Sequence, residues 1–242
     1  MNSDLSSIEL GKKAAAFKAL QFVNTGMIIG LGTGSTASWF VKLLAERIST
    51  EGLKVSCVPT STQTREQAKS LKIPLISLAQ VDYIDLVVDG ADEFDSTLNL
   101  IKGGGGALLQ EKIVAAASRK MLVITDSSKE SLIIGSFSLP VEIVQFGASS
   151  TKRHIEHIIK SMGFSGAGIT YRMNKYKEKF VTDEGHFIVD LELMEIRDAL
   201  LLEANLIKCP GVVETGLFLG MATTIIVGNG DGTCKLIGIQ SF

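Results

Sequence analysis

The first apolar pattern of the chain has the spacing of a helix. Apolar residues recur every three or four positions, at Leu10, Ala14, Phe17 and Leu20. Ser6 precedes this pattern and is followed three residues later by Glu9, which is a capping-box arrangement. A helix is therefore predicted over residues 7–23, and it is expected to stop near Gly26.

Between residues 27 and 125, short apolar runs alternate with helical patterns. The apolar runs predict buried strands at 27–31, 55–58, 84–88 and 121–125. The helical patterns predict helices at 37–48, 62–70 and 107–118. A further short strand is predicted at 73–76, where Pro74 favours an edge position. Strands that alternate with helices indicate an α/β fold built on a parallel sheet.

The pattern changes after Leu132 and predicts a second, smaller α+β domain. Strands are expected at 141–144, 168–173 and 179–191, and helices at 149–162 and 194–206. The strand at 179–191 is expected to turn at Asp183-Glu184-Gly185. From Cys209 the chain returns to the first module, where strands at 223–227 and 234–239 are joined by a glycine-rich hairpin loop.

The composition is that of an ordinary globular protein. The 242 residues are 45% hydrophobic and 21% charged, with a formal net charge of -2, so no basic surface for nucleic acid is expected. The N-terminus lacks the basic start and apolar core of a signal peptide. The uncharged span between Lys18 and Lys42 is rich in Gly, Ser and Thr, which makes it a poor membrane helix. The three cysteines are too far apart to suggest a disulfide framework or a zinc site, and a reduced cytoplasmic enzyme is favoured.

A glycine-rich turn follows the first predicted strand. It reads Gly30-Leu31-Gly32-Thr33-Gly34-Ser35-Thr36 and leads into a helix, an arrangement that binds anions through backbone amides and the helix dipole. The turn has neither the Gly-Lys-Ser/Thr ending of a nucleotide P-loop nor the G-x-G-x-x-G spacing. The next strand ends in Pro59-Thr60, without an acid for a ribose hydroxyl. A compact phosphate ester is therefore favoured over a nucleotide.

Acidic and basic residues follow two of the later predicted strands. Asp89 and Asp92 come after one strand and Lys129 after the next, and parallel sheets bind ligands beyond the carboxyl ends of their strands. Lys102 precedes four consecutive glycines, which let the backbone approach a ligand closely, and Glu111 lies early in the following helix. Each residue alone is as readily a helix cap, a surface acid or a salt-bridge partner. Together they favour a pocket equipped for proton transfer.

Seven segments occur in the order, and with the spacing, of motifs in one known family. They are Gly32-Thr33-Gly34-Ser35-Thr36-Ala37, Val88-Asp89-Gly90-Ala91-Asp92-Glu93, Ile101-Lys102-Gly103-Gly104-Gly105, Glu111-Lys112-Ile113, Asp126-Ser127-Ser128-Lys129, Leu139-Pro140-Val141-Glu142 and Pro210-Gly211-Val212-Val213-Glu214-Thr215-Gly216-Leu217-Phe218. On these motifs the chain resembles ribose-5-phosphate isomerase, type A, from about Leu10 to the last strand. A single one of these motifs could arise by chance, whereas the ordered set is specific for the family.

The resemblance implies an activity and an architecture. The activity is the interconversion of D-ribose 5-phosphate and D-ribulose 5-phosphate in the non-oxidative pentose phosphate pathway. The architecture is a Rossmann-like parallel-sheet catalytic domain over 1–132 and 208–242, with a small α+β domain over 133–207. The resemblance also implies a homodimer or homotetramer that uses neither metal nor organic cofactor. Its partner would be the sugar phosphate, with no nucleic acid and no membrane.

The resemblance also implies roles for individual residues. Glu111 becomes the proton acceptor, and Asp89, Asp92 and Lys102 become further catalytic groups. The implied substrate-binding residues are Thr33, Gly34, Ser35, Thr36, Asp89, Gly90, Ala91, Asp92, Lys102, Gly103, Gly104, Gly105 and Lys129, together with Lys12 as a phosphate-facing lysine. The chain departs from some members of the family at Gly106, where they have alanine, and this glycine is expected to loosen the loop slightly.

Two other classes of function stay open at this point. A related enzyme on the same scaffold could be a coenzyme A transferase, which needs a glutamate nucleophile and room for a long cofactor. It could also be an amino-sugar-phosphate deaminase, which needs a catalytic histidine, but none of His154, His157 and His186 lies near a predicted strand end. A non-catalytic sugar-phosphate sensor would be expected to carry a DNA-binding module, whereas the chain begins almost at once with the first α/β unit.

Overall fold

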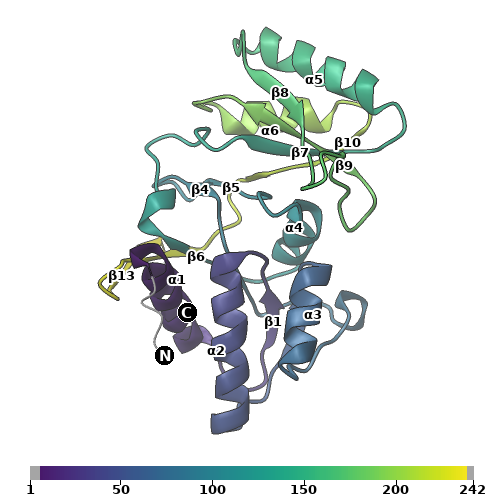
Figure 1. Ribbon diagram of the computed structural model, residues 1–242. Coiled ribbons are helices and arrows are strands. Elements are labelled where there is room, and N and C mark those ends of the chain that lie inside the picture. Colours follow the sequence, from purple (N-terminus) through teal and green to yellow (C-terminus); the bar gives the residue numbers. More distant parts are fainter. Residues whose placement is uncertain (1–5, 239–242) are drawn as a thin grey trace. The chain divides into compact units, whose positions relative to one another are not determined.

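The structure is a computed structural model that describes residues 6–238. The chain forms two compact units, and each is made of segments that are separate in the sequence (Figure 1). The first unit comprises the residues through Ala91, Gln110–Glu130 and the residues from Gly220 onward. The second unit comprises Asp92–Leu109 and Ser131–Leu219. The domain boundaries expected from the sequence stay a prediction.

A six-stranded sheet forms the centre of the first unit. Its strand order is β13-β12-β6-β3-β1-β2. The strands are β1 Ile28–Leu31, β2 Ser56–Pro59, β3 Leu86–Asp89, β6 Met121–Asp126, β12 Thr224–Gly228 and β13 Cys234–Gly238. All neighbours pair in parallel except β13, which is antiparallel to β12. The predicted α/β fold with a central parallel sheet is confirmed.

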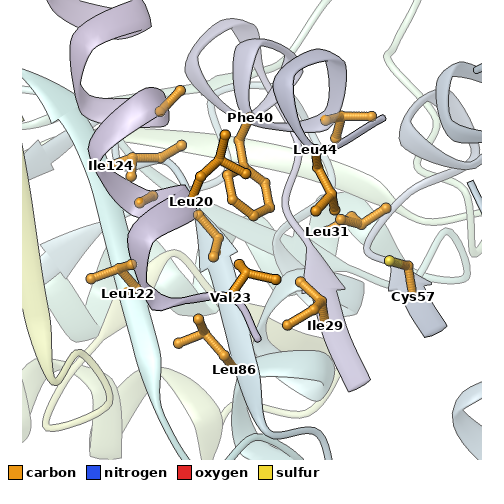
Figure 2. Packing of buried hydrophobic residues seen from close by; sticks show 14 of the residues in the cluster. Leu20, Val23, Ile29, Leu31, Phe40, Leu44, Cys57, Leu86, Leu122 and Ile124 are labelled. Carbon is orange, nitrogen blue, oxygen red and sulfur yellow. The ribbon is translucent and has the colours of Figure 1, made fainter. Parts of the chain in front are cut away.

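The helices of the first unit precede the first strand or connect parallel strands. They are α1 Ser7–Ala19, α2 Ser35–Glu51, α3 Thr62–Ser70 and α4 Leu108–Ala116, with short 3-10 turns η1 Leu20–Phe22, η2 Leu78–Gln80 and η3 Ser127–Lys129. The residues of α4 from Gln110 onward belong to this unit. Phe40 and Leu44 of α2 lie over Ile29 and Leu31 of β1 in the buried apolar cluster (Figure 2). Such crossovers place the carboxyl ends of the strands, and the loops that follow them, along one edge of the sheet.

Helix α1 forms where its pattern predicts, but it buries a different face. Leu10 and Phe17 are 40% and 63% exposed, whereas the buried residues are Gly11, Ala15, Ala16 and Ala19. A Cβ atom at Gly11 would lie 2.7 Å from the carbonyl oxygen of Gly228 in β12. The small residues therefore let the helix approach the strand closely, and this contact decides which side is buried.

Two sheets and two helices form the second unit. A four-stranded antiparallel sheet has the order β10-β7-β9-β8, with β7 Leu139–Ile143, β8 Gly168–Tyr171, β9 Phe187–Glu192 and β10 Val212–Thr215. Three two-residue strands pair in the order β11-β5-β4, with β4 Glu93–Phe94, β5 Leu100–Ile101 and β11 Leu217–Phe218. Helices α5 Ala148–Ser161 and α6 Ala199–Ile207 share a buried apolar cluster with the four-stranded sheet. The predicted smaller α+β part is confirmed.

Several predicted elements differ from the structure. Residues 179–186 are not a strand, because only isolated bridges form before β9 begins at Phe187. The helix predicted from residue 194 begins at Ala199, where the Asp198 carboxylate accepts a hydrogen bond from the Leu201 amide. Residues 73–76 make only an isolated bridge to Cys57. The last residue of the strand predicted at 234–239 lies outside the described residues.

Within residues 6–238, no helix has the length and apolar character needed to cross a membrane.

Candidate active site

The glycine-rich turn of the first unit is fixed by hydrogen bonds from its backbone. The Gly32 amide donates to the carbonyl of Val88, and the Thr33 amide donates to Oδ1 of Asp89 at 3.0 Å. A Cβ atom at Gly32 would lie 2.1 Å from Asp89 Oδ1 and 2.5 Å from Asp89 Cα, so only glycine fits there. Gly34 has a φ of +107°, which also favours glycine. The turn is thus held against the end of β3 before the helix begins.

Hydroxyl groups hold the same turn from the other side. Thr33 Oγ1 lies 2.8 Å from the hydroxyl oxygens of Thr60 and Ser61 and 3.2 Å from that of Thr64. All four residues are buried, and the Thr64 hydroxyl donates to the Gly32 carbonyl at 2.9 Å. The Thr33 side chain is therefore part of an internal network. No local motif predicts this cluster, because Thr33 lies about thirty positions from the segment that carries Thr60, Ser61 and Thr64.

The first turn of α2 follows this network. It carries Ser35, which is exposed, and Thr36, which is half-buried. No acidic side chain lies in this first turn. A helix N-terminus with hydroxyl donors favours an anion such as phosphate, because the free amides and the helix dipole carry partial positive charge.

Asp89 ends strand β3 and is fully buried. Its Oδ1 accepts hydrogen bonds from the amides of Thr33 at 3.0 Å and Gly90 at 2.7 Å. Gly90 and Ala91 follow it and are half-buried. The carboxylate is thus held by an amide of the glycine-rich turn and by an amide at the end of β3. Both segments belong to the predicted site.

Glu111 and Lys129 occupy two further positions in the first unit. Glu111 lies in the first turn of α4 and is only 4% exposed. Lys129 is half-buried and ends the 3-10 turn η3 directly after β6. Among residues 6–238, no carboxylate lies within ion-pairing distance of Lys129. A buried carboxyl and an available cation are the groups that a proton-transfer site for an anionic substrate requires.

Lys12 is held on α1 by an acidic neighbour. Its Nζ lies 2.8 Å from Oε1 of Glu9, and the other carboxylate oxygen accepts a hydrogen bond from Nε1 of Trp39 at 2.9 Å. The hydrogen bonds from Lys12 and Trp39 hold the pKa of Glu9 below its ordinary value. The ammonium group is therefore already paired, and a phosphate would have to compete with Glu9 for it.

The second unit contains the predicted lysine and the glycine loop. Lys102 is 2% exposed, its Nζ lies 5.3 Å from the centre of the Phe218 ring, and its amide donates to the Gly216 carbonyl. Asp92 Oδ2 accepts a hydrogen bond from the Gly104 amide at 2.7 Å. The bond from the Gly104 amide brings Asp92 and the loop after Lys102 together.

The glycine loop adopts conformations that other residues rarely reach. Gly103 and Gly106 have φ values of +99° and +82°. A Cβ atom at Gly104 would lie 2.5 Å from Asp92 Oδ1, and one at Gly106 would lie 2.5 Å from two ring carbons of Phe180. The expectation that Gly106 loosens the loop stays a prediction, and the structure shows in addition that this glycine leaves room for the Phe180 ring.

Sequence reasoning did not identify Arg172, which also contacts the glycine loop. Its Nη1 donates to the carbonyls of Gly103 and Gly104 at 2.5 and 3.2 Å. The residue follows strand β8 and lies nearly seventy positions from the loop. No local pattern indicates a role for it, since an arginine after a strand is usually a surface residue.

His186 and possible metal ligands were also compared with the expectations from the sequence. His186 Nδ1 lies 2.9 Å from the buried Glu142 carboxylate, which fits the structural role expected of it. Within the described residues, no group of three or more His, Cys, Asp or Glu side chains is arranged to hold a metal ion.

The sequence relatives and the solved structures that match nearly the whole chain agree with one another. A sequence model described as ribose 5-phosphate isomerase A (phosphoriboisomerase A) matches residues 56–232. The ribose-5-phosphate isomerase A of Dinoroseobacter shibae is 49% identical over 240 residues, which are 99% of this chain and 92% of that protein. A solved ribose 5-phosphate isomerase from Plasmodium falciparum has a TM-score of 0.89 at 36% identity, and the match covers 97% of this chain and 100% of that one. A D-ribose-5-phosphate isomerase solved in complex with phospho-erythronic acid has a TM-score of 0.88 at 38% identity, and covers 96% of this chain and 99% of its own.

Proposed function

The chain belongs to the ribose 5-phosphate isomerase A family, and we infer that it interconverts D-ribose 5-phosphate and D-ribulose 5-phosphate. The resemblance predicted from the sequence motifs is thereby confirmed. The observation that carries the function is the match at 49% identity over 99% of the chain. The roles of individual residues, given below, are our proposals for the mechanism.

The central step is the transfer of a proton between neighbouring carbons. Converting the aldose into the ketose removes a proton from C2 and returns one to C1 through an enediolate. We propose that Glu111 does both, because a single carboxylate can serve two adjacent carbons from one position. Its burial on α4 supports this role, since a carboxylate shielded from water needs little water displaced before it takes the proton. General base catalysis of this kind typically contributes about 10²- to 10⁴-fold in rate.

The enediolate carries negative charge that a nearby cation would stabilise. We propose that Lys102 and amides of the loop Gly103-Gly104-Gly105 supply this stabilisation. Lys102 is almost wholly buried, and a cation shielded from water acts more strongly on a developing oxyanion. The Gly104 amide is already used by Asp92, so the neighbouring amides are the better candidates within the loop.

The phosphate group gives the substrate a fixed end. We propose that Gly34, Ser35 and Thr36 at the start of α2 bind it, together with Lys129 and, through competition with Glu9, Lys12. The Thr33 amide and hydroxyl are used inside the turn, so its contribution is to hold the turn in shape. Fixing the phosphate would hold C1 and C2 in a reactive position.

The cyclic sugar must open before isomerisation. Opening moves a proton from the C1 hydroxyl to the ring oxygen, and acids can assist both transfers. We propose that Asp89 and Asp92 do so. Gly90 and Ala91, which lie between them in the sequence, would contact the substrate through their backbone. The backbone bonds to both carboxylates support this proposal, because they orient the acids before substrate arrives.

We further propose the assembly and setting implied by the family resemblance. The enzyme would form a homodimer or homotetramer and work in the cytoplasm, in the non-oxidative pentose phosphate pathway. Light scattering of the purified protein would test the assembly directly. A monomer at all working concentrations would reject it.

Proton NMR of ribose 5-phosphate in D₂O tests the function itself. With purified protein and excess chelator, we expect ribulose 5-phosphate to appear with deuterium at the exchanged carbon. Exchange without ketose would indicate a related proton-transfer enzyme with another substrate. Neither exchange nor product, from folded protein, would reject the isomerase and leave the non-catalytic sensor.

The variant Glu111→Gln tests the proton acceptor. It should lower kcat by about 10²- to 10⁴-fold while substrate binding is kept, since the amide preserves shape but accepts no proton. Glu66→Gln is the matched control, because Glu66 is an exposed glutamate of the same unit that pairs with Lys69. A Glu111→Gln enzyme with a near-normal rate would refute the role.

A further inference from the structure

The guanidinium of Arg172 joins the glycine loop to a single acid of the second unit. Its Nε and Nη2 donate to the two carboxylate oxygens of Asp190, the first at 3.0 Å. Its Nη1 donates to the carbonyls of Gly103 and Gly104 at 2.5 and 3.2 Å. Both charged side chains are mostly buried, at 15% and 19% exposure. A bidentate pair of this kind fixes the plane of the guanidinium, and so fixes the direction of its remaining donors.

The position of Arg172 is itself set by the sheet. Its amide donates to the Ile188 carbonyl at 2.9 Å, directly after β8 ends at Tyr171. Asp190 is on β9 and pairs with Thr170 in β8. The guanidinium is therefore carried by two adjacent strands. The loop, in contrast, consists of glycines without side chains, and its hydrogen bond from the Gly106 amide to the Gly103 carbonyl involves neither the Gly104 carbonyl nor the Gly105 amide.

The two carbonyls bonded by Arg172 belong to consecutive peptide groups. In the first, the Gly103 carbonyl is bonded by Arg172 and the Gly104 amide by Asp92 at 2.7 Å, so both ends are held. In the second, the Gly104 carbonyl is bonded by Arg172. In a trans peptide the N–H points opposite to the C=O, and no cis peptide occurs in the described residues. Holding the Gly104 carbonyl therefore turns the Gly105 N–H away from the guanidinium.

We propose that Arg172, held by Asp190, is a positioning residue that aims the Gly105 amide at the oxyanion of the enediolate. The proposal rests on the isomerase function given above and adds a residue to it. Asp190 neutralises the arginine locally, so the effect on catalysis comes from the orientation of the loop and not from added positive charge. Without Arg172 the glycines would sample many conformations, and the donor would have to be ordered in each turnover.

The variants follow from the bonds. Arg172→Met keeps a side chain of similar length and removes all of its donors. Arg172→Lys keeps a cation, but one that can make only some of the hydrogen bonds to Asp190 and to the Gly103 and Gly104 carbonyls. Asp190→Asn removes the charge that fixes the guanidinium. Arg197→Met is the matched control, since Arg197 pairs with Glu195 in the same unit but is 81% exposed.

The affinities of two ligands distinguish a loss of loop positioning from a general disruption of the site. Phospho-erythronic acid, which a related isomerase binds, carries a carboxylate at the reacting end, and erythritol 4-phosphate carries only a hydroxyl there. Arg172→Met should lower kcat by about 10- to 100-fold, below the loss on removing a full oxyanion donor, with KM changed less than about twofold. The same variant should raise the Kd for phospho-erythronic acid by about tenfold and leave the Kd for erythritol 4-phosphate nearly unchanged. Arg172→Lys should fall between Arg172→Met and wild type, and Arg197→Met should match wild type throughout.

A double variant tests whether Arg172 and Asp190 act together on the loop. Arg172→Met combined with Asp190→Asn should be no slower than Arg172→Met alone. Additive losses, equal weakening of the two ligands, or an unchanged kcat in Arg172→Met would each overturn the proposal. If Arg172→Met does not fold, Arg172→Lys carries the same ligand comparison. Failure of the function is distinguishable, because it would appear as absent turnover in the wild-type protein.

Discussion

The chain holds two glycine-rich turns, one in each unit, by different chemistry. The turn before α2 is bonded to the Val88 carbonyl and the Asp89 carboxylate at the end of β3, and to a cluster of buried hydroxyls. In the loop after Lys102 the Gly106 amide donates to the Gly103 carbonyl, and charged side chains bond the loop as well, with Asp92 on an amide and Arg172 on two carbonyls. The first turn is therefore fixed by a carboxylate, neutral hydroxyls and close packing, whereas the second is fixed by side chains of both charges.

The difference fits what each turn would do in the proposed mechanism. A phosphate keeps its charge throughout the reaction, so a turn that binds it needs only a constant shape. A loop that stabilises an enediolate meets charge that comes and goes, and preoriented donors save the cost of reorganising at that moment. Charged anchors are stronger than neutral hydrogen bonds, which suits a segment made of flexible glycines. The two turns should therefore respond differently to substitution and to pH.

The largest effect is expected from Gly32→Ala in the first turn. The new Cβ would lie 2.5 Å from Asp89 Cα, and backbone cannot move aside as a flexible side chain can. We expect a loss of about 3 kcal/mol or more in the free energy of unfolding, or failure to fold. The control is Gly90→Ala, whose Cβ would meet nothing closer than 3.8 Å. Urea unfolding measures both variants, and equal losses would contradict the packing argument.

The second largest effect is expected from Gly106→Ala in the other loop. Its Cβ would lie 2.5 Å from the Phe180 ring, and its φ of +82° adds strain. A loss of about 2 kcal/mol in the free energy of unfolding is expected. Gly185→Ala is the control, because Gly185 has a φ of +80° with nothing within 4 Å, and so reports strain alone. The added variant Phe180→Leu should reduce the difference between the two; an unchanged difference would show that the ring is not its cause.

A smaller effect is expected from Thr60→Val in the hydroxyl cluster. The Leu31 carbonyl keeps the hydrogen bond from the Thr60 amide, and the Thr33 hydroxyl keeps Ser61 and Thr64. Since each partner retains another bond, the expected loss in unfolding free energy is about 1 kcal/mol. Thr50→Val is the control, an exposed threonine on α2 that bonds the Glu46 carbonyl. A loss as large as that of Gly32→Ala would mean that the hydroxyls, and not packing, dominate this turn.

The two turns also differ in how far the sequence predicts them. The first is a contiguous strand, turn and helix, and its anion-binding character follows from local spacing. Helix α3 has the bounds predicted for it, and Ser61 caps its start by accepting a hydrogen bond from the Thr64 amide. The second turn depends on Arg172, whose role arises from the pairing of β8 with β9. Such a contact has no signature in the segment that carries it.

Other misses have the same physical origin. Strands β4, β5 and β11 have two residues each, which is too short for an alternating pattern. The face that α1 buries is decided by the approach of Gly11 to Gly228, far away in the sequence. Helical spacing predicts that a helix forms, but a close contact between backbones decides how it packs. The sequence therefore predicts elements and motif positions better than the side chains that hold them.

The smallest effect is a dependence of stability on pH that should arise in the second unit. Burial alone would raise the pKa of Glu93, but hydrogen bonds from the Ser131 and Ser136 hydroxyls and from the amides of Gly135 and Phe137 outweigh it, so the pKa lies below the ordinary 4.5. A carboxyl with a lowered pKa in the folded state stabilises the fold fully above its unfolded pKa. That contribution is lost as the pH falls through the folded pKa. In Glu93→Gln the free energy of unfolding should therefore fall less steeply below pH 4.5 than in wild type.

Glu142 provides the matched control within the same unit. It too is buried, but burial raises its pKa, and this outweighs the hydrogen bonds from Thr182 and His186. Its folded form holds a proton at a pH where the unfolded form has released it, so its contribution to stability declines as pH rises above 4.5. Glu142→Gln should remove that decline, which is the opposite change in slope. Unfolding measured from pH 3 to 7 compares the variants, and each slope is limited by one proton to about 1.4 kcal/mol per pH unit. Slopes of the same sign would mean that the hydrogen bonds around Glu93 do not outweigh its burial, and the charged anchoring of this unit would then be weaker than its geometry indicates.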